Sequence, residues 1–147
     1  MINIDIKKLS NTAKIPTHGS KEAAGYDLYA DISEDFVAIE PHTTQKIPTG
    51  LSIAIPDGYF GAIFARSGLA TREGLRPANA VGVIDQDYRG EIIVALHNDS
   101  NHERFVNKGS RIAQLVIMPY LAVKFNEVDK LNTTSRGTGG FGSTGVN

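Results

Sequence analysis

Arg111-Ile112-Ala113-Gln114-Leu115-Val116-Ile117-Met118 is an almost continuous apolar run, and runs of this kind decide the fold class of the chain. Short runs in which all or every second residue is apolar predict β-strands. Turn signals such as Pro56-Asp57-Gly58 and Asn107-Lys108-Gly109 separate them. The other predicted strands cover residues 2–6, 36–40, 51–55, 59–65, 91–96 and 120–125. This spacing predicts an all-β protein, built as a sandwich, jelly roll or barrel.

One short segment, residues 67–74, indicates a helix of one or two turns. Ser67 can cap its first turn, Leu69 and Ala70 can face inward, and Gly74 can end it. We therefore expect a β-protein with a single short helix.

The composition favours one domain and excludes several classes of protein. With 147 residues the chain can bury one hydrophobic core. The absence of Cys excludes a disulfide framework, a thiolate metal site and a cysteine nucleophile, and it weakly favours a reducing compartment. The net charge of -1 gives no general attraction to nucleic acid, and no apolar stretch reaches membrane-spanning length. The alternating pattern of residues 2–6 is also unlike a signal peptide, so we expect neither a nucleic-acid partner nor a membrane partner.

The C-terminal residues 131–147 differ in composition from the rest of the chain. They contain five Gly and six Ser or Thr, too little apolar surface for a core of their own. We therefore divide the chain into a domain, residues 1–130, and a flexible Gly-rich arm, residues 131–147. The run from Gly137 to Gly142 fits G-x-G-x-x-G but lacks the strand and helix of that motif. The arm could close over a phosphorylated nucleotide through Arg136 and Phe141, or it could be a disordered tail.

The segment Ala65-Arg66-Ser67-Gly68-Leu69-Ala70 is a candidate anion site. It follows a predicted strand and opens the predicted helix, so backbone amides, a hydroxyl and a guanidinium can converge on one ligand. The alternative is an ordinary helix start beside an exposed arginine.

The segment Gly82-Val83-Ile84-Asp85-Gln86-Asp87-Tyr88-Arg89-Gly90-Glu91 predicts a hairpin that returns into residues 91–96. The carboxylate of Asp85 could act as a general base on water, and the ring of Tyr88 could cover a sugar or a base. Asp and Gly are also common in turns without any function, so a purely structural hairpin remains the alternative.

Weaker signals come from two polar residues in apolar surroundings. Asp27 lies between Tyr26 and Leu28, and Gln114 interrupts its apolar strand, so each needs polar partners if it is buried. The four histidines show no metal-ligand spacing. An oxygen-ligated Mg²⁺ remains possible, because that ion takes much of its shell from phosphates and water.

Five segments, taken in order, resemble the five motifs of the trimeric dUTP pyrophosphatases, the dUTPase family. The match extends from Ala23 to Gly145, nearly the whole chain. Any one motif is weak, but five in the same order are highly specific. They are Ala23-Ala24-Gly25-Tyr26-Asp27-Leu28, Ala65-Arg66-Ser67-Gly68-Leu69-Ala70, Gly82-Val83-Ile84-Asp85-Gln86-Asp87-Tyr88-Arg89-Gly90, Gly109-Ser110-Arg111-Ile112-Ala113-Gln114-Leu115 and Arg136-Gly137-Thr138-Gly139-Gly140-Phe141-Gly142-Ser143-Thr144-Gly145.

The resemblance implies a jelly-roll-like β-barrel that forms a homotrimer, with each active site shared between chains. It implies Mg²⁺-dependent hydrolysis of dUTP to dUMP and pyrophosphate, which limits uracil in DNA and supplies dUMP for dTMP synthesis. A cytoplasmic location follows, or the host cytoplasm or nucleus for a viral protein.

The resemblance also implies roles for individual residues. Asp85 is the catalytic residue that orients the attacking water, and Tyr88 excludes a 2′-hydroxyl. Asp27 contacts Mg²⁺ through a metal-bound water. The expected substrate-binding residues are Arg66, Ser67, Gly68 and Gln114 at the phosphates, Asn79 and Val83 at uracil, and Arg136, Phe141, Gly142 and Ser143 in the closing arm.

Three other functions compete with this interpretation. The related dCTP deaminases share the fold, but Ala95 occupies the place of their glutamate base. A nucleotide-sensing regulatory protein could use the same fold without turnover, although Asp85 and a complete fifth motif argue against a dead enzyme. A carbohydrate-binding β-sandwich would show no dependence on Mg²⁺. One departure from the family pattern is Ser110, where many members carry aspartate.

Overall fold

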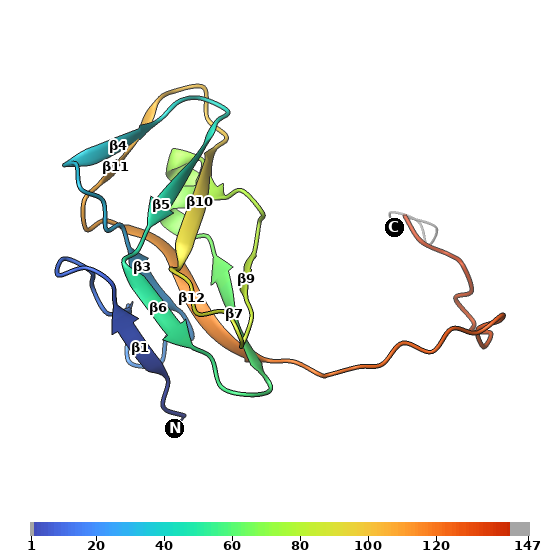
Figure 1. Ribbon diagram of the computed structural model, residues 1–147. Helices are drawn as coiled ribbons and strands as arrows, with labels where there is room; N and C mark the ends of the chain where they lie inside the picture. Colours follow the sequence, from blue (N-terminus) through green and yellow to red (C-terminus); the bar gives the residue numbers. More distant parts are fainter. Residues whose placement is uncertain (1, 142–147) are drawn as a thin grey trace.

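The computed structural model describes residues 2–141 and is all-β with one short helix (Figure 1). The elements are β1 (Asp5–Lys8), β2 (Thr17–His18), β3 (Tyr26–Tyr29), β4 (Phe36–Ile39), β5 (Thr44–Pro48), β6 (Leu51–Ala54), β7 (Tyr59–Phe64), η1 (Leu69–Glu73), β8 (Leu75–Pro77), β9 (Gly82–Ile84), β10 (Ile93–Asn98), β11 (Arg104–Asn107) and β12 (Arg111–Pro119). The predicted fold class is confirmed.

The strands form four antiparallel sheets, and the largest has the order β2-β3-β12-β7-β9. The other sheets are β5-β10-β8, β1-β6 and β11-β4. In the largest sheet β12 lies between β3 and β7, so Gln114 faces both Asp27 and Phe64. Segments far apart in the sequence therefore meet on β12.

The core follows from the alternation of side chains along the strands. On β10, Val94 and Leu96 are buried, whereas Ile93, the first residue of the strand, is exposed. Val94 and Leu96 belong to one core cluster with the fully buried Leu28 of β3 and Ile47 of β5. Burial of each large aliphatic side chain contributes about 1.5–3 kcal/mol, which makes this core the main source of stability.

The helix ends as predicted but begins differently. Gly74 ends it in the left-handed conformation, at a φ of 69°. Gly68 occupies the first capping position without a side-chain hydrogen bond, so the predicted capping by Ser67 is wrong. Instead the Ser67 backbone carbonyl accepts a hydrogen bond of 2.7 Å from Thr71 Oγ1. The Ser67 side chain is exposed.

The predicted hairpin across residues 82–96 is also wrong. β9 pairs with β7, whereas β10 pairs with β5 and β8. The segment between β9 and β10 therefore passes from one sheet to another. The physical reason is burial: Val94 and Leu96 reach the core only through the β5-β10-β8 sheet, while Gly82 and Ile84 pack on β7.

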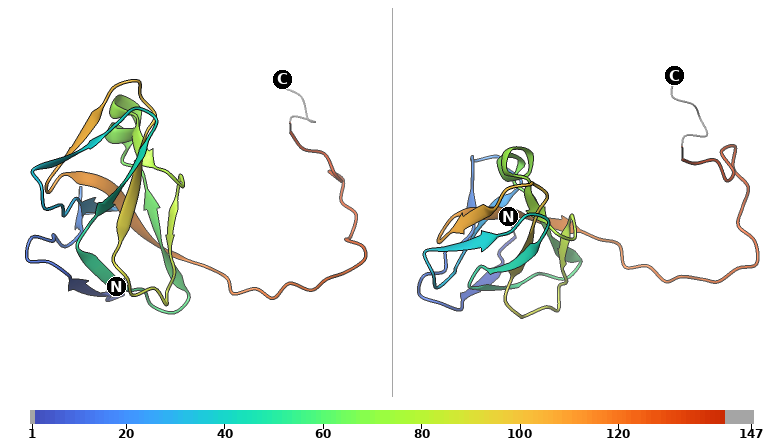
Figure 2. Two further views of the ribbon diagram at one scale, coloured as in Figure 1. Left: turned by 45° about the horizontal axis from the view of Figure 1, so that its top comes forward. Right: turned by 90° about the horizontal axis from the view of Figure 1, so that it is seen from above.

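The predicted strand at residues 120–125 is not formed. The last strand ends at Pro119, and the chain then runs away from the sheets as an exposed segment (Figures 1 and 2). Its apolar residues Leu121, Val123 and Phe125 are exposed by 87%, 67% and 92%. A strand needs a neighbouring strand to pair with, and in the described part of this chain none lies beside these residues.

Candidate active site

One group of polar side chains gathers where β3, β7 and β12 meet. Asp27 lies on β3, Gln114 lies opposite it on β12, and Arg66 follows the end of β7. The sheet register thus brings together three of the predicted site residues, although Asp27 and Arg66 are 39 positions apart in the sequence.

Asp27 is the buried centre of this group, with its side chain only 10% exposed. Its Oδ1 accepts a hydrogen bond of 2.8 Å from Arg66 Nε, and its Oδ2 accepts one of 3.2 Å from Arg111 Nη1. One carboxylate is balanced by two guanidinium groups, so the group carries a net positive charge. Arg66 and Arg111 are 27% and 50% exposed and remain accessible to an anion.

Gln114 connects the first, second and fourth motifs. Its Nε2 donates a hydrogen bond of 2.9 Å to the Ala65 carbonyl. Its Oε1 lies against Gly25, where an added Cβ would collide with that oxygen. A larger residue at position 25 would therefore have to displace the Gln114 amide.

Ser67 and Gly68 continue directly from Arg66 and are both exposed. The space around Gly68 is open, since a Cβ built there would meet no atom within 4 Å. The predicted phosphate-binding residues of the second motif therefore border the Asp27 group.

A second group follows β9. The Tyr88 amide donates to the Asp85 carbonyl at 3.1 Å, and the Tyr88 hydroxyl donates to the Glu91 carbonyl at 2.9 Å. The ring lies against Gly90, where a Cβ would collide with it. Val83, Asp85 and Tyr88 are all exposed, and the first two border an open hollow with Phe60, Gln86, Asp87 and Tyr120.

Asn79 precedes β9 in a tight turn. The Ala80 amide donates to the Pro77 carbonyl at 3.0 Å, and the Val81 amide donates to the Asn79 carbonyl at 2.7 Å. Ala80 adopts a φ of 61°, a conformation that residues other than glycine rarely take. Asn79 is thus presented to solvent on a constrained loop.

Within one chain the two groups lie at opposite ends of β7. Ile84 pairs with Gly61, so Asp85 continues toward Phe60, while Arg66 comes two residues after Phe64. At about 3.3 Å per residue, Phe60 and Phe64 alone are about 13 Å apart. A single chain therefore does not bring Asp85 and Arg66 together.

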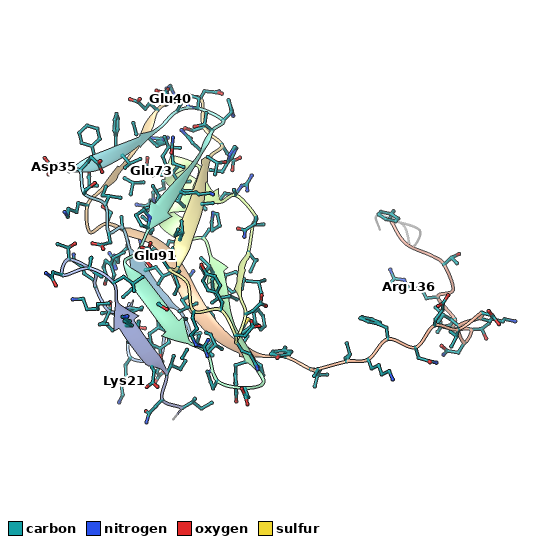
Figure 3. The ribbon with its side chains drawn as sticks, in the orientation of Figure 1. Lys21, Asp35, Glu40, Glu73, Glu91 and Arg136 are labelled. Carbon is teal, nitrogen blue, oxygen red and sulfur yellow. The ribbon has the colours of Figure 1, made fainter. Side chains whose placement is uncertain are left out.

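The arm holds the remaining predicted residues. Arg136 lies far from the sheets (Figure 3), and its Nε donates to the Gly139 carbonyl of the arm at 3.0 Å. Phe141 is fully exposed. Gly142 and Ser143 lie outside the described residues.

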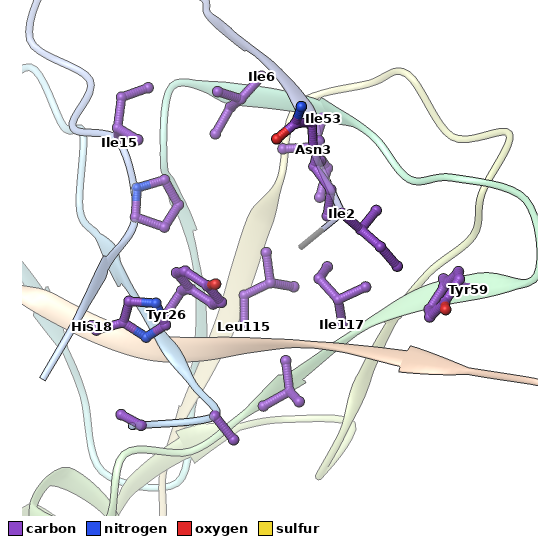
Figure 4. Close-up of a pocket in the computed structure, with 15 residues that line it drawn as sticks. Ile2, Asn3, Ile6, Ile15, His18, Tyr26, Ile53, Tyr59, Leu115 and Ile117 are labelled. Carbon is purple, nitrogen blue, oxygen red and sulfur yellow. The ribbon is translucent and has the colours of Figure 1, made fainter. Parts of the chain in front are cut away.

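The structure also has an apolar cavity that contains none of the predicted site residues (Figure 4). It lies between the N-terminal segment and β12, and its labelled lining includes Ile2, Ile15, Leu115 and Ile117. His18 lies against Tyr26 in this lining, with 3.9 Å between the ring centroids and an interplanar angle of 41°. Because the lining is mostly apolar, this cavity is not suited to a polyanion.

The sequence missed three residues that border the predicted site. Arg111 holds Asp27, and Gln86 accepts hydrogen bonds from the Gly58 amide at 3.2 Å and from the Tyr120 hydroxyl at 3.0 Å. Arg111 and Gln86 stand inside the quoted motifs, so their motif positions were a usable signal. Tyr120 had none.

No cluster of three or more His, Cys, Asp or Glu side chains that could hold a metal ion occurs in residues 2–141. Over the same residues, no helix has the length and hydrophobicity needed to span a membrane.

A dUTPase family model matches residues 11–145. The chain belongs to the dUTPase family. Similar curated proteins carry the name deoxyuridine 5′-triphosphate nucleotidohydrolase. The one from Desulfitobacterium hafniense is 47% identical over 146 residues, covering 99% of this chain and 96% of the relative. The one from Rickettsia prowazekii is 44% identical over 147 residues, covering 99% of each.

Solved dUTPases share the fold. The dUTPase of Staphylococcus bacteriophage 80alpha, solved with dUPNHPP, is 29% identical and superposes with a TM-score of 0.85. The alignment covers 99% of this chain and 100% of that one. The order of elements described above is thus the dUTPase fold.

Proposed function

We propose that this dUTPase hydrolyses dUTP to dUMP and pyrophosphate, in active sites that three copies of the chain share. The observation that carries the proposal is the Asp27, Arg66 and Gln114 group, an anion-binding arrangement held by the dUTPase sheet. Family membership over nearly the whole chain supports the same substrate.

In this proposal the phosphates bind at the Asp27 group, which carries a net positive charge. Arg66 is oriented through Nε by Asp27, so its terminal nitrogens can donate to phosphate oxygens. Ser67 and Gly68, both exposed, follow Arg66 directly, and the Gln114 amide is held beside them by its hydrogen bond to the Ala65 carbonyl. This arrangement supplies fixed donors where the triphosphate charge must be balanced.

Water activation falls to Asp85. Its carboxylate is exposed beside an open hollow, free to orient a water for attack on the α-phosphorus. Tyr88 stands three residues later, and the hydroxyl end of its ring is fixed by the Glu91 carbonyl and by contact with Gly90. A ring fixed in this way can exclude a 2′-hydroxyl.

Val83 and Asn79 hydrogen-bond uracil, and a site with such groups rejects a base that would leave them unpaired.

The residues present fit a magnesium ion that arrives with the phosphates. Asp27 is a single carboxylate already bonded to two guanidinium groups, so it suits a metal-bound water better than direct ligation. Mg²⁺ needs few protein ligands when phosphates and water complete its shell. When bound, the ion neutralises phosphate charge that the near-neutral chain cannot balance alone.

A homotrimer accounts for two features of the single chain. Asp85 and Arg66 lie at opposite ends of β7, so a second chain must supply one of them to a common site. The apolar residues Leu121, Val123 and Phe125 are exposed in a segment that pairs with no strand among residues 2–141. Both features are resolved if neighbouring copies pack together.

The arm completes the site from a third direction. Arg136 then meets the γ-phosphate and Phe141 stacks on uracil, with Gly142 and Ser143 adjoining them. Closure of such a segment on substrate excludes water and assembles the catalytic groups only when needed. In this proposal the flexible arm comprises residues 131–147 and the folded domain comprises residues 1–130.

The proposed location of the protein is the cytoplasm or, for a viral protein, the host cytoplasm or nucleus.

The test is release of pyrophosphate from dUTP, dCTP, UTP and dTTP, each with and without Mg²⁺. The proposal expects turnover of dUTP with Mg²⁺, strong loss after chelation, and little activity on the other nucleotides. Release of ammonia from dCTP would indicate a deaminase instead, although Ala95 offers no carboxylate for that chemistry. Absence of dUTP turnover in the folded trimer would refute the proposal.

A further inference from the structure

The loop that presents Asn79 is fastened to the sheet by a side chain outside the five motifs, Arg76. Arg76 lies on β8 opposite His97 of β10. Its Nη1 donates to the Pro77 carbonyl at 3.2 Å and to the Ala78 carbonyl at 3.5 Å. Arg76 therefore binds the backbone that leads directly into Asn79.

Asp99 holds the guanidinium of Arg76 in this position. Its Oδ2 accepts from Arg76 Nε at 2.6 Å, and its Oδ1 accepts from Nη2 at 3.1 Å. The Asp99 amide donates to the Gly74 carbonyl at 2.9 Å, which fixes the acid beside the end of η1. All three guanidinium nitrogens are thus engaged, a bidentate geometry that lysine cannot reproduce.

The other polar neighbours extend this contact to β5. His97 Nε2 lies 3.5 Å from Asp99 Oδ1, and His97 Nδ1 lies 2.9 Å from Thr44 Oγ1. Thr44, His97 and Arg76 are cross-strand neighbours on one face of the β5-β10-β8 sheet. The Arg76–Asp99 contact is therefore supported by three paired strands.

The loop needs such a fastening because its backbone is strained. Ala80 has a φ of 61°, and the Val81 amide closes a three-residue turn on the Asn79 carbonyl. Strained conformations of this kind persist only when the surrounding structure fixes them. On its other side the loop is held by the Ala78 amide, which donates to the Ala95 carbonyl at 2.8 Å.

We propose that Arg76, clamped by Asp99, is a positioning residue that fixes the Asn79 loop and thereby sets affinity and base selectivity for the nucleotide. The inference rests on the proposed dUTP hydrolysis and adds to it a determinant outside the motifs. Arg76 touches neither the phosphates nor the attacking water in this account. Its loss changes KM and selectivity and spares kcat.

The experiment compares Arg76→Met, Arg76→Lys, Asp99→Asn and the Arg76→Met/Asp99→Asn double variant with the wild type. We measure kcat and KM for dUTP, kcat/KM for dCTP, and the dissociation constant of dUMP by calorimetry. The matched control is Arg104→Met, because Arg104 forms a salt bridge of 2.7 Å with Glu73 at similar exposure and bonds to no residue of the Asn79 loop.

For Arg76→Met we expect a rise of about tenfold in KM and in the dUMP dissociation constant, with kcat changed by less than about twofold. Selectivity for dUTP over dCTP falls by about tenfold, and Arg76→Lys does not restore it. Asp99→Asn has a smaller effect in the same direction. The double variant is no worse than Arg76→Met, since both changes release one clamp.

Failure of the inference is distinguishable from failure of the proposed function. An inactive wild type refutes dUTP hydrolysis. An active wild type with unchanged KM and selectivity in Arg76→Met overturns the role of Arg76 alone. Equal changes in Arg76→Met and Arg104→Met also overturn it, because they trace to general stability. If Arg76→Met fails to fold, Arg76→Lys and Asp99→Asn carry the same comparison.

Discussion

The Asp27 group and the C-terminal arm supply the same kind of residue to the proposed site in opposite ways. Arg66 is fixed by a carboxylate that two guanidinium groups share, on strands paired through β12. Arg136 stands in an exposed segment, and its hydrogen bond among residues 2–141 goes to the arm itself, at Gly139. One arginine is therefore positioned before substrate arrives, whereas the other must be positioned by it.

The difference teaches which residues couple function to folding. Asp27 and Gln114 are part of the framework, so a change there alters the sheet as well as the site. Within the described part of the arm, residues 131–141, every residue is exposed except the half-buried Gly139 and Gly140, so a change there should alter function alone. Asp85 and Tyr88 are intermediate, with exposed side chains on a segment that the sheets hold.

Asp85→Asn should have the largest effect, a loss of catalytic rate with the fold unchanged. The amide keeps the shape but cannot act as a base, so we expect kcat to fall by about 10²–10⁴-fold while dUTP still binds. Single-turnover assays and calorimetry with dUTP measure the two effects separately. Asp87→Asn is the control, because that carboxylate borders the same hollow. Turnover near the wild-type level would remove Asp85 from the mechanism.

Removal of residues 136–147 should separate function from fold most clearly. It deletes Arg136 and Phe141, so we expect kcat/KM to fall by about 10²-fold or more, with unfolding by denaturant unchanged. Arg136→Ala in the full-length chain isolates the loss of the guanidinium. A truncated protein that is fully active, or that no longer folds, contradicts the lid role of the arm.

Asp27→Asn should lower both stability and substrate binding, unlike a change in the arm. Asparagine offers one acceptor where two guanidinium groups need two, so one of them loses its partner. We expect a loss of about 1–3 kcal/mol in unfolding free energy, together with a higher KM for dUTP. Denaturant titration checks the first and steady-state kinetics the second. Glu73→Gln, which breaks an exposed salt bridge with Arg104, should change neither appreciably.

Tyr88→Ala should have the smallest effect on dUTP itself and a clear effect on selectivity. Without the ring, a 2′-hydroxyl fits, so the ratio of kcat/KM for dUTP over UTP should fall by about tenfold or more. Tyr88→Phe keeps the ring and loses only the hydrogen bond to the Glu91 carbonyl, so it should stay selective. An unchanged ratio in Tyr88→Ala would place this residue outside the sugar pocket.

Local patterns in the sequence predicted several strands of the framework but missed others, such as β3, β5 and β11, and they predicted the long-range contacts poorly. Residues 51–55, 59–65 and 111–118 read as strands because their apolar runs are themselves the strands β6, β7 and β12. The pairing of Asp27 with Arg66 and Arg111 depends on sheet register, which spans 39 and 84 positions and leaves no local pattern. The position of each residue within a motif indicated the site, but not its partners.

The wrong hairpin prediction for residues 82–96 and the wrong strand prediction for residues 120–125 have a common cause. Residues 82–96 carry turn signals between two apolar runs, yet the runs belong to different sheets. Residues 120–125 alternate as a strand does, yet a single chain provides no strand beside them. In both cases the local pattern did not contain the pairing partner, which decides whether a strand forms and which sheet it joins.

The central claim is that Asp85 and Arg66 of one active site come from different chains. Two inactive variants, Asp85→Asn and Arg66→Gln, are unfolded, mixed in equal amounts and refolded together, with sedimentation used to confirm mixed trimers. Random mixing should leave both residues intact in roughly a quarter of the sites, so dUTP hydrolysis returns to roughly that fraction of the wild-type rate. If the mixture stays as inactive as its components, each site draws both residues from a single chain, and the account is contradicted.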